Sequence, residues 1–508
     1  MKLEVTSRAP GFLALAFIAA ALSAGFLPVL WMGVGQGLSG FDPYLARVLR
    51  FTLVQAGLST VISMVIGVPV ARALARQRFR GRGHIVRLLS LPLALPAIVV
   101  IIGVIEVYGS KGWLGGAFEI YGLQGILLAH VFFNFPLAAR LALSDLERVP
   151  PESWKLAAQL NFGGHDIWRL IEWPQLRGSL PGIALLIFLL CASSFAIVLT
   201  LGGGPRATTL EVAIYQALRA DFDPARAAAL AIVQLLLCAS LATIAQRWGG
   251  LVLNAPSYRN AVIRYDGQSA AARIADAAVI ALGLVILMPP LLALAVSGVL
   301  NIHPSSELWR AGLTSLGLGT ATAIMALLIV WPLAARAARS VTWRKAANVL
   351  VLAGWIIPPA VLATGWFIVL SRHADVMGLA PVLVIAMNGL MALPFAFQAL
   401  APALTQSAAQ NDRLCASLGV SGFNRLRLID LPALRKPLGL ALIMAFVVSL
   451  GDLTAISLFG TQGLVTFPAL IYRQMGTYHI DEAVGTALVL ALFVLALMSL
   501  AERWSKTP

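Results

Sequence analysis

Apolar residues run along this chain in long uninterrupted stretches, separated by shorter segments that carry most of the charge. Twelve stretches approach the roughly 20 residues that an α-helix needs to cross the hydrocarbon core of a bilayer. Because apolar and polar residues do not alternate within them, they predict helices and argue against a membrane β-barrel. The predicted spans are residues 11–32, 51–71, 88–107, 122–143, 179–201, 227–246, 277–300, 311–335, 346–371, 379–401, 437–459 and 483–501. The expected fold class is therefore all-α integral membrane, with about twelve transmembrane helices.

Composition supports this assignment. Charged residues make up only 12% of the 508 residues, too few to cover the surface of a water-soluble protein of this size. The apolar run at 11–32 is too long for the core of a signal peptide, so we expect it to be retained as the first span. The three cysteines, Cys191, Cys238 and Cys415, form no CxxC or Cys/His spacing, so no metal site is expected.

The net charge of +15 raises the question of a nucleic-acid partner, but the distribution of the charge answers it. With the N-terminus in the cytoplasm, roughly three quarters of the 37 Lys and Arg residues fall on the cytoplasmic side, as the positive-inside rule requires. The densest cluster, six arginines within 72–87, is interpreted as an anchor on anionic lipid. We therefore expect both termini to be cytoplasmic and the charged surface to face the lipid bilayer, with no nucleic-acid partner.

The second half of the chain repeats the first at an offset near 258 residues, with Pro136 matching Pro394 and Pro174 matching Pro432. Six spans per copy is an even number, so both copies have the same orientation and form a parallel repeat. The predicted organisation is a first permease half at 1–250, a cytoplasmic linker at 251–273 and a second half at 274–508.

Each half contains a matching cytoplasmic loop between its fourth and fifth spans, at 144–178 and 405–436. Small residues let a short helix lie close to another protein, and a leucine supplies an apolar anchor. Asn161 and Gly419 favour the left-handed conformation that ends a helix. The candidate docking residues are Lys155, Leu156, Ala157, Ala158, Leu160 and Asn161 in the first loop, and Arg413, Leu414, Cys415, Ala416, Leu418 and Gly419 in the second.

These loops resemble the EAA motif of ABC importer permeases, in which a short coupling helix docks in a cleft of the ATPase. Lys155 and Arg413 replace the glutamate of the motif in the two loops. Asn161 replaces the glycine of the motif in the first loop. The resemblance implies a type I ABC importer permease with two fused six-helix halves. The alternative is a pair of amphipathic loops that lie on the lipid surface.

The stretches 121–134, 201–209 and Glu172-Trp-Pro are similar to those of thiamine/thiamine pyrophosphate importer permeases. That resemblance implies transport of thiamine, and of its phosphates, across the bacterial inner membrane. It implies a periplasmic thiamine-binding protein and two copies of a separate ABC ATPase, which use ATP and Mg. This chain is then a transporter subunit, not an enzyme, with no catalytic residue and no cofactor of its own. Ferric iron importers are the nearest competing family.

Asp452 is the one carboxylate well inside a predicted span, and the repeat pairs it with Ser194. Because thiamine is a cation, Ser193, Ser194, Ser449 and Asp452 are candidates for the substrate pathway. The competing interpretation is that Asp452 caps a broken turn beside Gly451. Gly202, Gly203, Gly204 and Pro205 are interpreted either as an exit turn or as a periplasmic gate.

Two other classes remain to be weighed. An ion-coupled secondary transporter can also have twelve helices in two parallel halves, but it usually relies on several ionisable groups within the membrane. A membrane-bound enzyme needs a cluster of His, Asp, Glu or Cys near one interface. The six histidines are instead scattered along the chain.

Overall fold

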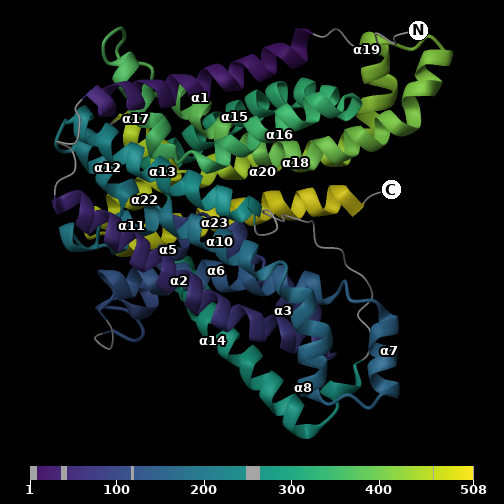
Figure 1. Cartoon of the computed structure of the whole chain (residues 1–508). Coiled ribbons are helices and arrows are strands. Elements are labelled where there is room, and N and C mark those ends of the chain that lie inside the picture. The colour runs from purple at the N-terminus through teal and green to yellow at the C-terminus, as the bar shows by residue number, and fades with distance from the viewer. Residues whose placement is uncertain (1–8, 36–42, 116–118, 248–263, 462, 507–508) are drawn as a thin grey trace. The chain divides into compact units, whose positions relative to one another are not determined.

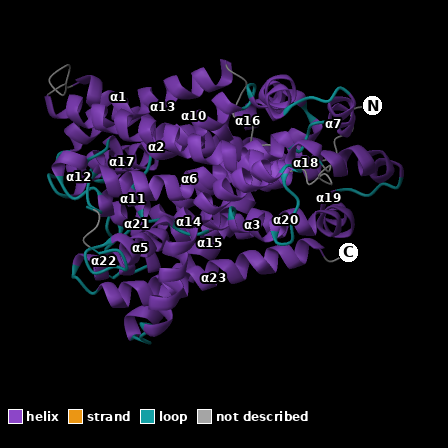
Figure 2. Ribbon diagram, turned by 90° about the horizontal axis from the view of Figure 1, so that it is seen from below, coloured by secondary structure: helices purple, strands orange, loops and turns teal. Residues whose placement is uncertain are grey.

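The structure is a computed structural model that describes residues 9–35, 43–115, 119–247, 264–461 and 463–506. Over these residues the chain forms helices, turns and loops and contains no strand (Figures 1 and 2). Nine helices in the described part are long and apolar enough to cross a membrane, or eleven if each sharply bent pair counts as one span. The all-helical membrane class is confirmed.

Eight of the predicted spans are single long helices. They are α1 (Ala9–Gly35), α2 (Pro43–Arg76), α6 (Leu123–Leu146), α13 (Pro224–Arg247), α14 (Ala270–Leu300), α15 (Ser306–Arg339), α18 (Ala380–Ser417) and α23 (Ile480–Lys506). Several extend beyond the predicted ends because the helix continues past the apolar core into charged turns, as α2 does to Arg76.

The other four predicted spans are interrupted, which the apolar pattern alone did not specify. The third span of the first half consists of α3 (Arg82–Leu88), α4 (Leu91–Ala94) and α5 (Ala97–Tyr108), with a bend of 110° before α5. Its counterpart is divided into α16 (Val341–Ile356) and α17 (Pro359–Leu370). Both breaks lie at a proline, Pro96 or Pro358, because the residue before a proline is disfavoured in the helical region.

The fifth span of each half is also interrupted, at positions that the repeat relates. Ser193–Phe195 separate α10 (Leu180–Ala192) from α11 (Ala196–Leu201). Asp452 and Leu453 separate α20 (Leu431–Gly451) from α21 (Thr454–Phe459). Short helices α12 (Leu210–Arg219) and α22 (Phe467–Gly476) follow in the two halves.

The chain forms two compact units, and they are not the two sequence halves. One unit contains Asp42–Val212 and Leu237–Asn301; the other contains Met1–Phe41, Ala213–Leu236 and Ile302–Pro508. The first helix of each half is therefore exchanged. Helix α14 packs on α2 and α5, whereas α1 packs on α15 and α17. The division of the sequence into two repeated halves joined by a linker at 251–273 stays a prediction.

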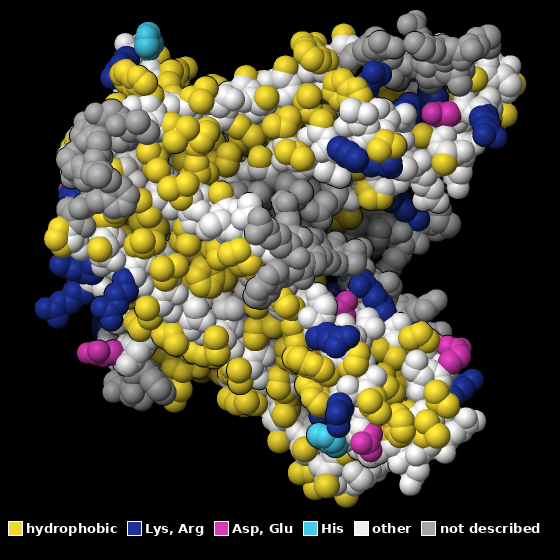
Figure 3. Space-filling view, viewed as in Figure 1, with side chains coloured by type: hydrophobic (Ala, Val, Ile, Leu, Met, Phe, Trp, Pro, Cys, Tyr) yellow, Lys and Arg dark blue, Asp and Glu magenta, His cyan; other side chains and the backbone are white. Residues whose placement is uncertain are grey.

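Glycines permit the two exchanged helices to pack closely. A methyl group added at Gly103 of α5 would meet the carbonyl of Pro290 on α14, and one added at Gly365 of α17 would meet the backbone of Gly25 on α1. Small residues at helix crossings let backbones approach within membranes, where close packing replaces the hydrophobic effect. Figure 3 shows hydrophobic side chains over much of the surface in view, with Lys and Arg in small groups between them.

Most of the predicted linker, residues 251–263, lies outside the described residues. After Arg264 a single turn, η4 (Tyr265–Gly267), leads into α14. Ser269 caps the first turn of α14, since its side chain accepts from the N–H of Ala272. The last residues before the second half are therefore structured.

Candidate coupling loops and substrate pathway

The first candidate coupling helix is α7 (Pro151–Gln159). A short loop that ends at Pro150 separates it from α6. Asn161 has φ of 51°, the left-handed conformation predicted for it. The N–H of Asn161 donates to Ala158 (3.1 Å) and that of Phe162 to Ala157 (3.0 Å). These two bonds form a Schellman motif, which stops the helix sharply.

The second candidate coupling helix is the end of α18, so the fourth span and the docking segment are one continuous helix. Gly419 has φ of 66°, and the N–H of Val420 donates to the carbonyl of Cys415 at 2.9 Å. The helix therefore ends at the residue that the repeat pairs with Asn161. Ala408 and Ala409 stand where the first half has its two prolines, and alanine continues a helix that proline interrupts.

Both candidate helices expose apolar side chains to solvent. Leu160 is 56% exposed and Leu418 is 67% exposed, although each lies in a charged segment where a polar residue would suffice. Leu156 and Leu414 are also exposed, as are Lys155, Ala158, Arg413 and Ala416. Ala157 and Cys415 face inward and are buried. Leu156 with Leu160, and Leu414 with Leu418, place two exposed leucines at the end of each short helix, and such apolar patches are typical of a surface that another protein covers.

A buried arginine fixes the base of the first loop. Arg264 forms ion pairs with Glu172 and Asp266, both at 2.7 Å, and its guanidinium lies 4.0 Å from the ring centroid of Trp154. Arg72 of α2 donates to Glu172 at 2.6 Å. Burial opposes the charge of Arg264, but hydrogen bonds and charges from Asp266 and Glu172 outweigh it and raise its pKa above the ordinary value.

Tyr265 connects the same linker turn to the end of α7. Its hydroxyl lies 2.9 Å from the carbonyl oxygen of Ala157 and 2.7 Å from that of Phe162, and it donates its proton to this pair. Both carbonyls belong to the Schellman ending. The chain leading into α14 is thus bonded directly to the coupling helix, and Figure 1 shows α7 and α8 near the N-terminal end of α14.

The second loop uses charges of its own. Arg425, almost completely buried, pairs with Asp412 and, at 3.3 Å, with Asp430. Arg339 of α15 forms two hydrogen bonds to Asp412, at 3.0 and 3.1 Å. Asp430 and Glu172 occupy equivalent repeat positions. Each loop therefore ends in an acid held by arginine immediately before the fifth span begins.

The segment between coupling helix and membrane has the same irregular backbone in both halves. A helical turn, α8 (Gly164–Ile167) or α19 (Gly422–Arg425), leads into a π-helix, η2 (Trp168–Glu172) or η5 (Leu426–Asp430). In the first half α9 (Trp173–Leu176) follows. Each π-helix ends at the anchoring acid, and such wide turns are rare and often occur at functional sites.

The candidate pathway residues lie at the two breaks in the fifth spans. Asp452 caps α21, since its carboxylate accepts from the N–H groups of Thr454 and Ala455, both at 3.0 Å. Ser449 donates to Thr322 of α15 and accepts from Asn388 of α18. Ser193 donates to the carbonyl of Leu189 at 2.7 Å, and Ser194 lies in the break itself. The capping interpretation is confirmed as geometry, and the pathway role stays a prediction.

The glycines after α11 form a sharp turn. Gly203 and Gly204 have φ of 68° and 129°, which a residue with a side chain rarely adopts, and Pro205 begins a short 3-10 turn. Gly202 is buried. The exit turn is therefore present, and the gate role of these residues remains a prediction.

Sequence reasoning missed Arg264, Tyr265 and Arg425. Tyr265 lies 108 residues from Ala157 in the chain, so no local pattern could pair them. The signal available was weaker: Glu172 and Asp430 share a repeat position before a proline, and a buried acid requires a cation.

Comparison with known proteins gives the same picture. Residues 332–506 match the family described as binding-protein-dependent transport system inner membrane component. The thiamine transport system permease protein ThiP of Brucella abortus is 45% identical over 98% of this chain and 95% of its own length. The ThiP proteins of Salmonella typhimurium and Escherichia coli are each 40% identical over 97% of this chain and 96% of their own. The chain belongs to the family of thiamine transport system permease proteins.

Proposed function

We propose that this chain carries thiamine across the bacterial inner membrane as the permease subunit of a binding-protein-dependent ABC importer. Full-length similarity to ThiP proteins supports the substrate. The observation that carries the mechanism is a pair of helix ends with exposed leucines. Each helix ends at a residue in the left-handed conformation, and the two residues occupy the same position in the repeat. Thiamine phosphates are included as substrates, since the chain resembles permeases for thiamine pyrophosphate.

The partners follow from this mechanism. Two ABC ATPase subunits bind the helices ending at Leu160 and Leu418, hydrolyse ATP with Mg, and leave this chain without a catalytic role. A periplasmic binding protein delivers thiamine to the opposite face, where Gly202–Pro205 act as a gate. Both termini lie in the cytoplasm. Closure of the ATPase dimer moves the two helices together, and the permease alternates between outward and inward access.

Reconstitution in liposomes tests this proposal. The chain, its ATPase and the binding protein should accumulate radiolabelled thiamine only with ATP, and thiamine-loaded binding protein should stimulate ATP hydrolysis. Uptake should persist when the membrane potential is collapsed. Uptake that needs the potential but no ATP would identify a secondary transporter, and stimulation by ferric iron alone would reassign the substrate.

The pathway role of Asp452 can be separated from its capping role. Asparagine also caps helices well, but its single amide oxygen can accept only one of the two N–H groups that Asp452 binds, so Asp452→Asn should retain part of the α21 cap while removing the negative charge. We expect thiamine transport to fall about tenfold, with thermal stability changed by less than about 1 kcal/mol. Asp452→Ala, which removes both the cap and the charge, is the comparison. Normal uptake by Asp452→Asn would remove this residue from the pathway.

A further inference from the structure

A large pocket lies beside the first coupling loop and has no role in the proposed transport cycle. It has a volume of about 810 Å³ and is formed by the end of α2, helix α3, the turn before α14 and the first turns of α14. Its walls lie within one compact unit. The volume falls in the range of small-molecule sites, roughly 300–1,000 Å³.

One end of this pocket is strongly basic. Arg76, Arg78, Arg264 and Arg273 line it, and the lining residues include no Asp or Glu. Arg76 pairs with Asp276, and Arg264 is held by Glu172 and Asp266. Arg78 and Arg273 are exposed, and neither guanidinium group has an ion-pair or hydrogen-bond partner in the part of the chain that the structure describes. Two arginines are thus available to bind an anion.

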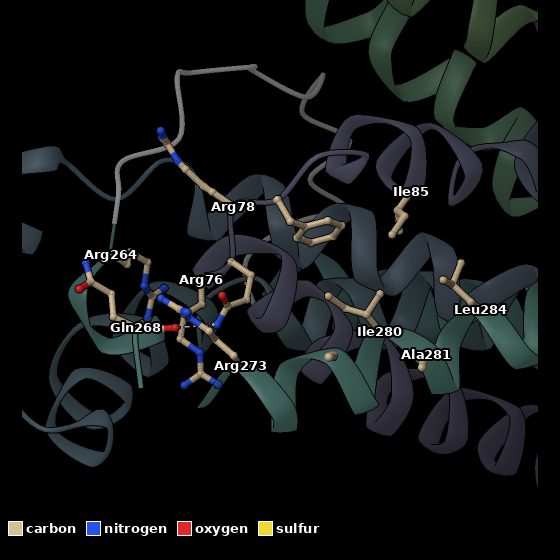
Figure 4. Close-up of a pocket in the computed structure, with 13 residues that line it drawn as sticks. Arg76, Arg78, Ile85, Arg264, Gln268, Arg273, Ile280, Ala281 and Leu284 are labelled. Carbon is tan, nitrogen blue, oxygen red and sulfur yellow. Dashed lines mark hydrogen bonds between the residues drawn. The ribbon is translucent and has the colours of Figure 1, made fainter. Parts of the chain in front are cut away.

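The other end of the pocket is apolar. Ile85, Ile280, Ala281 and Leu284 gather there, away from the arginines, as Figure 4 shows. Arg273, Ile280 and Leu284 lie on one face of α14, in order from its N-terminus toward the middle of the span. Eleven residues of helix cover about 16 Å, close to the depth of one leaflet of hydrocarbon.

We propose that this pocket binds an anionic phospholipid. The phosphate headgroup lies at the basic end, which Arg78 and Arg273 line, and one acyl chain follows Ile280 and Leu284 along α14. A free phosphate would use only the basic end and leave the apolar end without a ligand. Basic pockets between transmembrane helices commonly hold acidic headgroups. Because Arg264 contributes both to this pocket and to the base of the first coupling loop, the bound lipid would lie against the coupling apparatus.

Native mass spectrometry of the full chain, titrated with phosphatidylglycerol or phosphatidylcholine, tests the proposal. Arg78→Gln with Arg273→Gln should weaken phosphatidylglycerol binding about thirtyfold, from the usual contribution of two arginines near a membrane surface. Arg169→Gln with Arg177→Gln, two exposed arginines of the same compact unit that lie outside both the pocket and the 72–87 cluster, is the matched control and should change binding less than about twofold. Ala281→Trp should also displace the lipid, by filling the apolar end.

Three results would overturn the proposal. Phosphatidylglycerol could bind both double variants equally, which would indicate diffuse attraction to basic charge. Ala281→Trp could bind as well as the parent, which would leave the apolar end unused. Inorganic phosphate or pyrophosphate could compete as effectively as the lipid, which would identify a soluble anion as the occupant. Elution of each variant as a single folded species in detergent validates the comparison.

Discussion

The two coupling loops reach the same ending by different means. In the first half a pair of prolines separates α7 from its span, and the cation that holds Glu172 comes partly from the turn before α14. In the second half α18 continues to Ser417 without a break, and Arg425 of the same loop holds both Asp412 and Asp430. The helix ending is therefore the same in both halves, whereas the support of the acid before the fifth span is not. Glu172 is held by arginines from two distant segments, and Asp430 is held by Arg425 of its own loop, although Arg339 of α15 also binds Asp412.

If both helices dock on the ATPase, losing both apolar anchors should have the largest effect. Burying each leucine contributes about 1.5–3 kcal/mol, so Leu160→Glu with Leu418→Glu should weaken ATPase assembly by at least about a hundredfold. Copurification of the ATPase with the membrane-inserted chain measures this. Leu170→Glu with Leu428→Glu is the control, since both side chains are exposed in the same loops but outside the coupling helices. Retained ATPase in the first variant would break the assignment.

Removing the buried arginine of the second loop should give the next largest effect. Arg425→Met leaves Asp430 without its cation, and breaking a buried pair in this way typically costs about 3–5 kcal/mol. Arg264→Met should cost less, because Arg72 still donates to Glu172. Thermal unfolding in detergent measures both, with the exposed Arg427→Met as control. Equal losses of stability in Arg264→Met and Arg425→Met would contradict the view that two arginines share Glu172 whereas Arg425 holds Asp430.

Tyr265→Phe sharpens the comparison with a smaller change. It removes the hydroxyl that donates to the ending of α7, at a cost of about 1 kcal/mol, and keeps the ring. Amide exchange at Phe162 should accelerate about fivefold if the ending opens locally. In the described part of the chain no tyrosine hydroxyl bonds the helix ending of the second loop, so the amide of Val420 should exchange at its former rate. Faster exchange at both amides would mean a general loss of stability.

The apolar pattern predicted the all-helical membrane class and the positions of the spans, and the repeat predicted where the two candidate coupling helices end, because these features depend on residues close together in the sequence. Asn161 and Gly419 were predicted to be left-handed, and both are. The exchange of α1 and α14 could not be predicted in this way, since Gly103 with Pro290 and Gly365 with Gly25 are contacts between distant segments. A break beside Gly451 was weighed as the capping alternative for Asp452, whereas the matching break at Ser193–Phe195 was missed because it lies inside an apolar run with no proline beside it.

The smallest expected effect concerns the residues that end the two coupling helices. Glycine adopts positive φ without steric cost, whereas asparagine adopts it with a small one. Asn161→Gly should therefore stabilise the first ending by about 0.5 kcal/mol, and Gly419→Asn should destabilise the second by a similar amount. Valine at either position should cost about 1–2 kcal/mol, because a β-branched side chain opposes this conformation.

Amide exchange at Phe162 and Val420 reports each ending separately. Because Tyr265 bonds only the first, Asn161→Gly should recover about half of the lost free energy in the Tyr265→Phe background and slow exchange at Phe162 about twofold. Failure to do so would mean that Tyr265 acts on α7 by some means other than its helix ending.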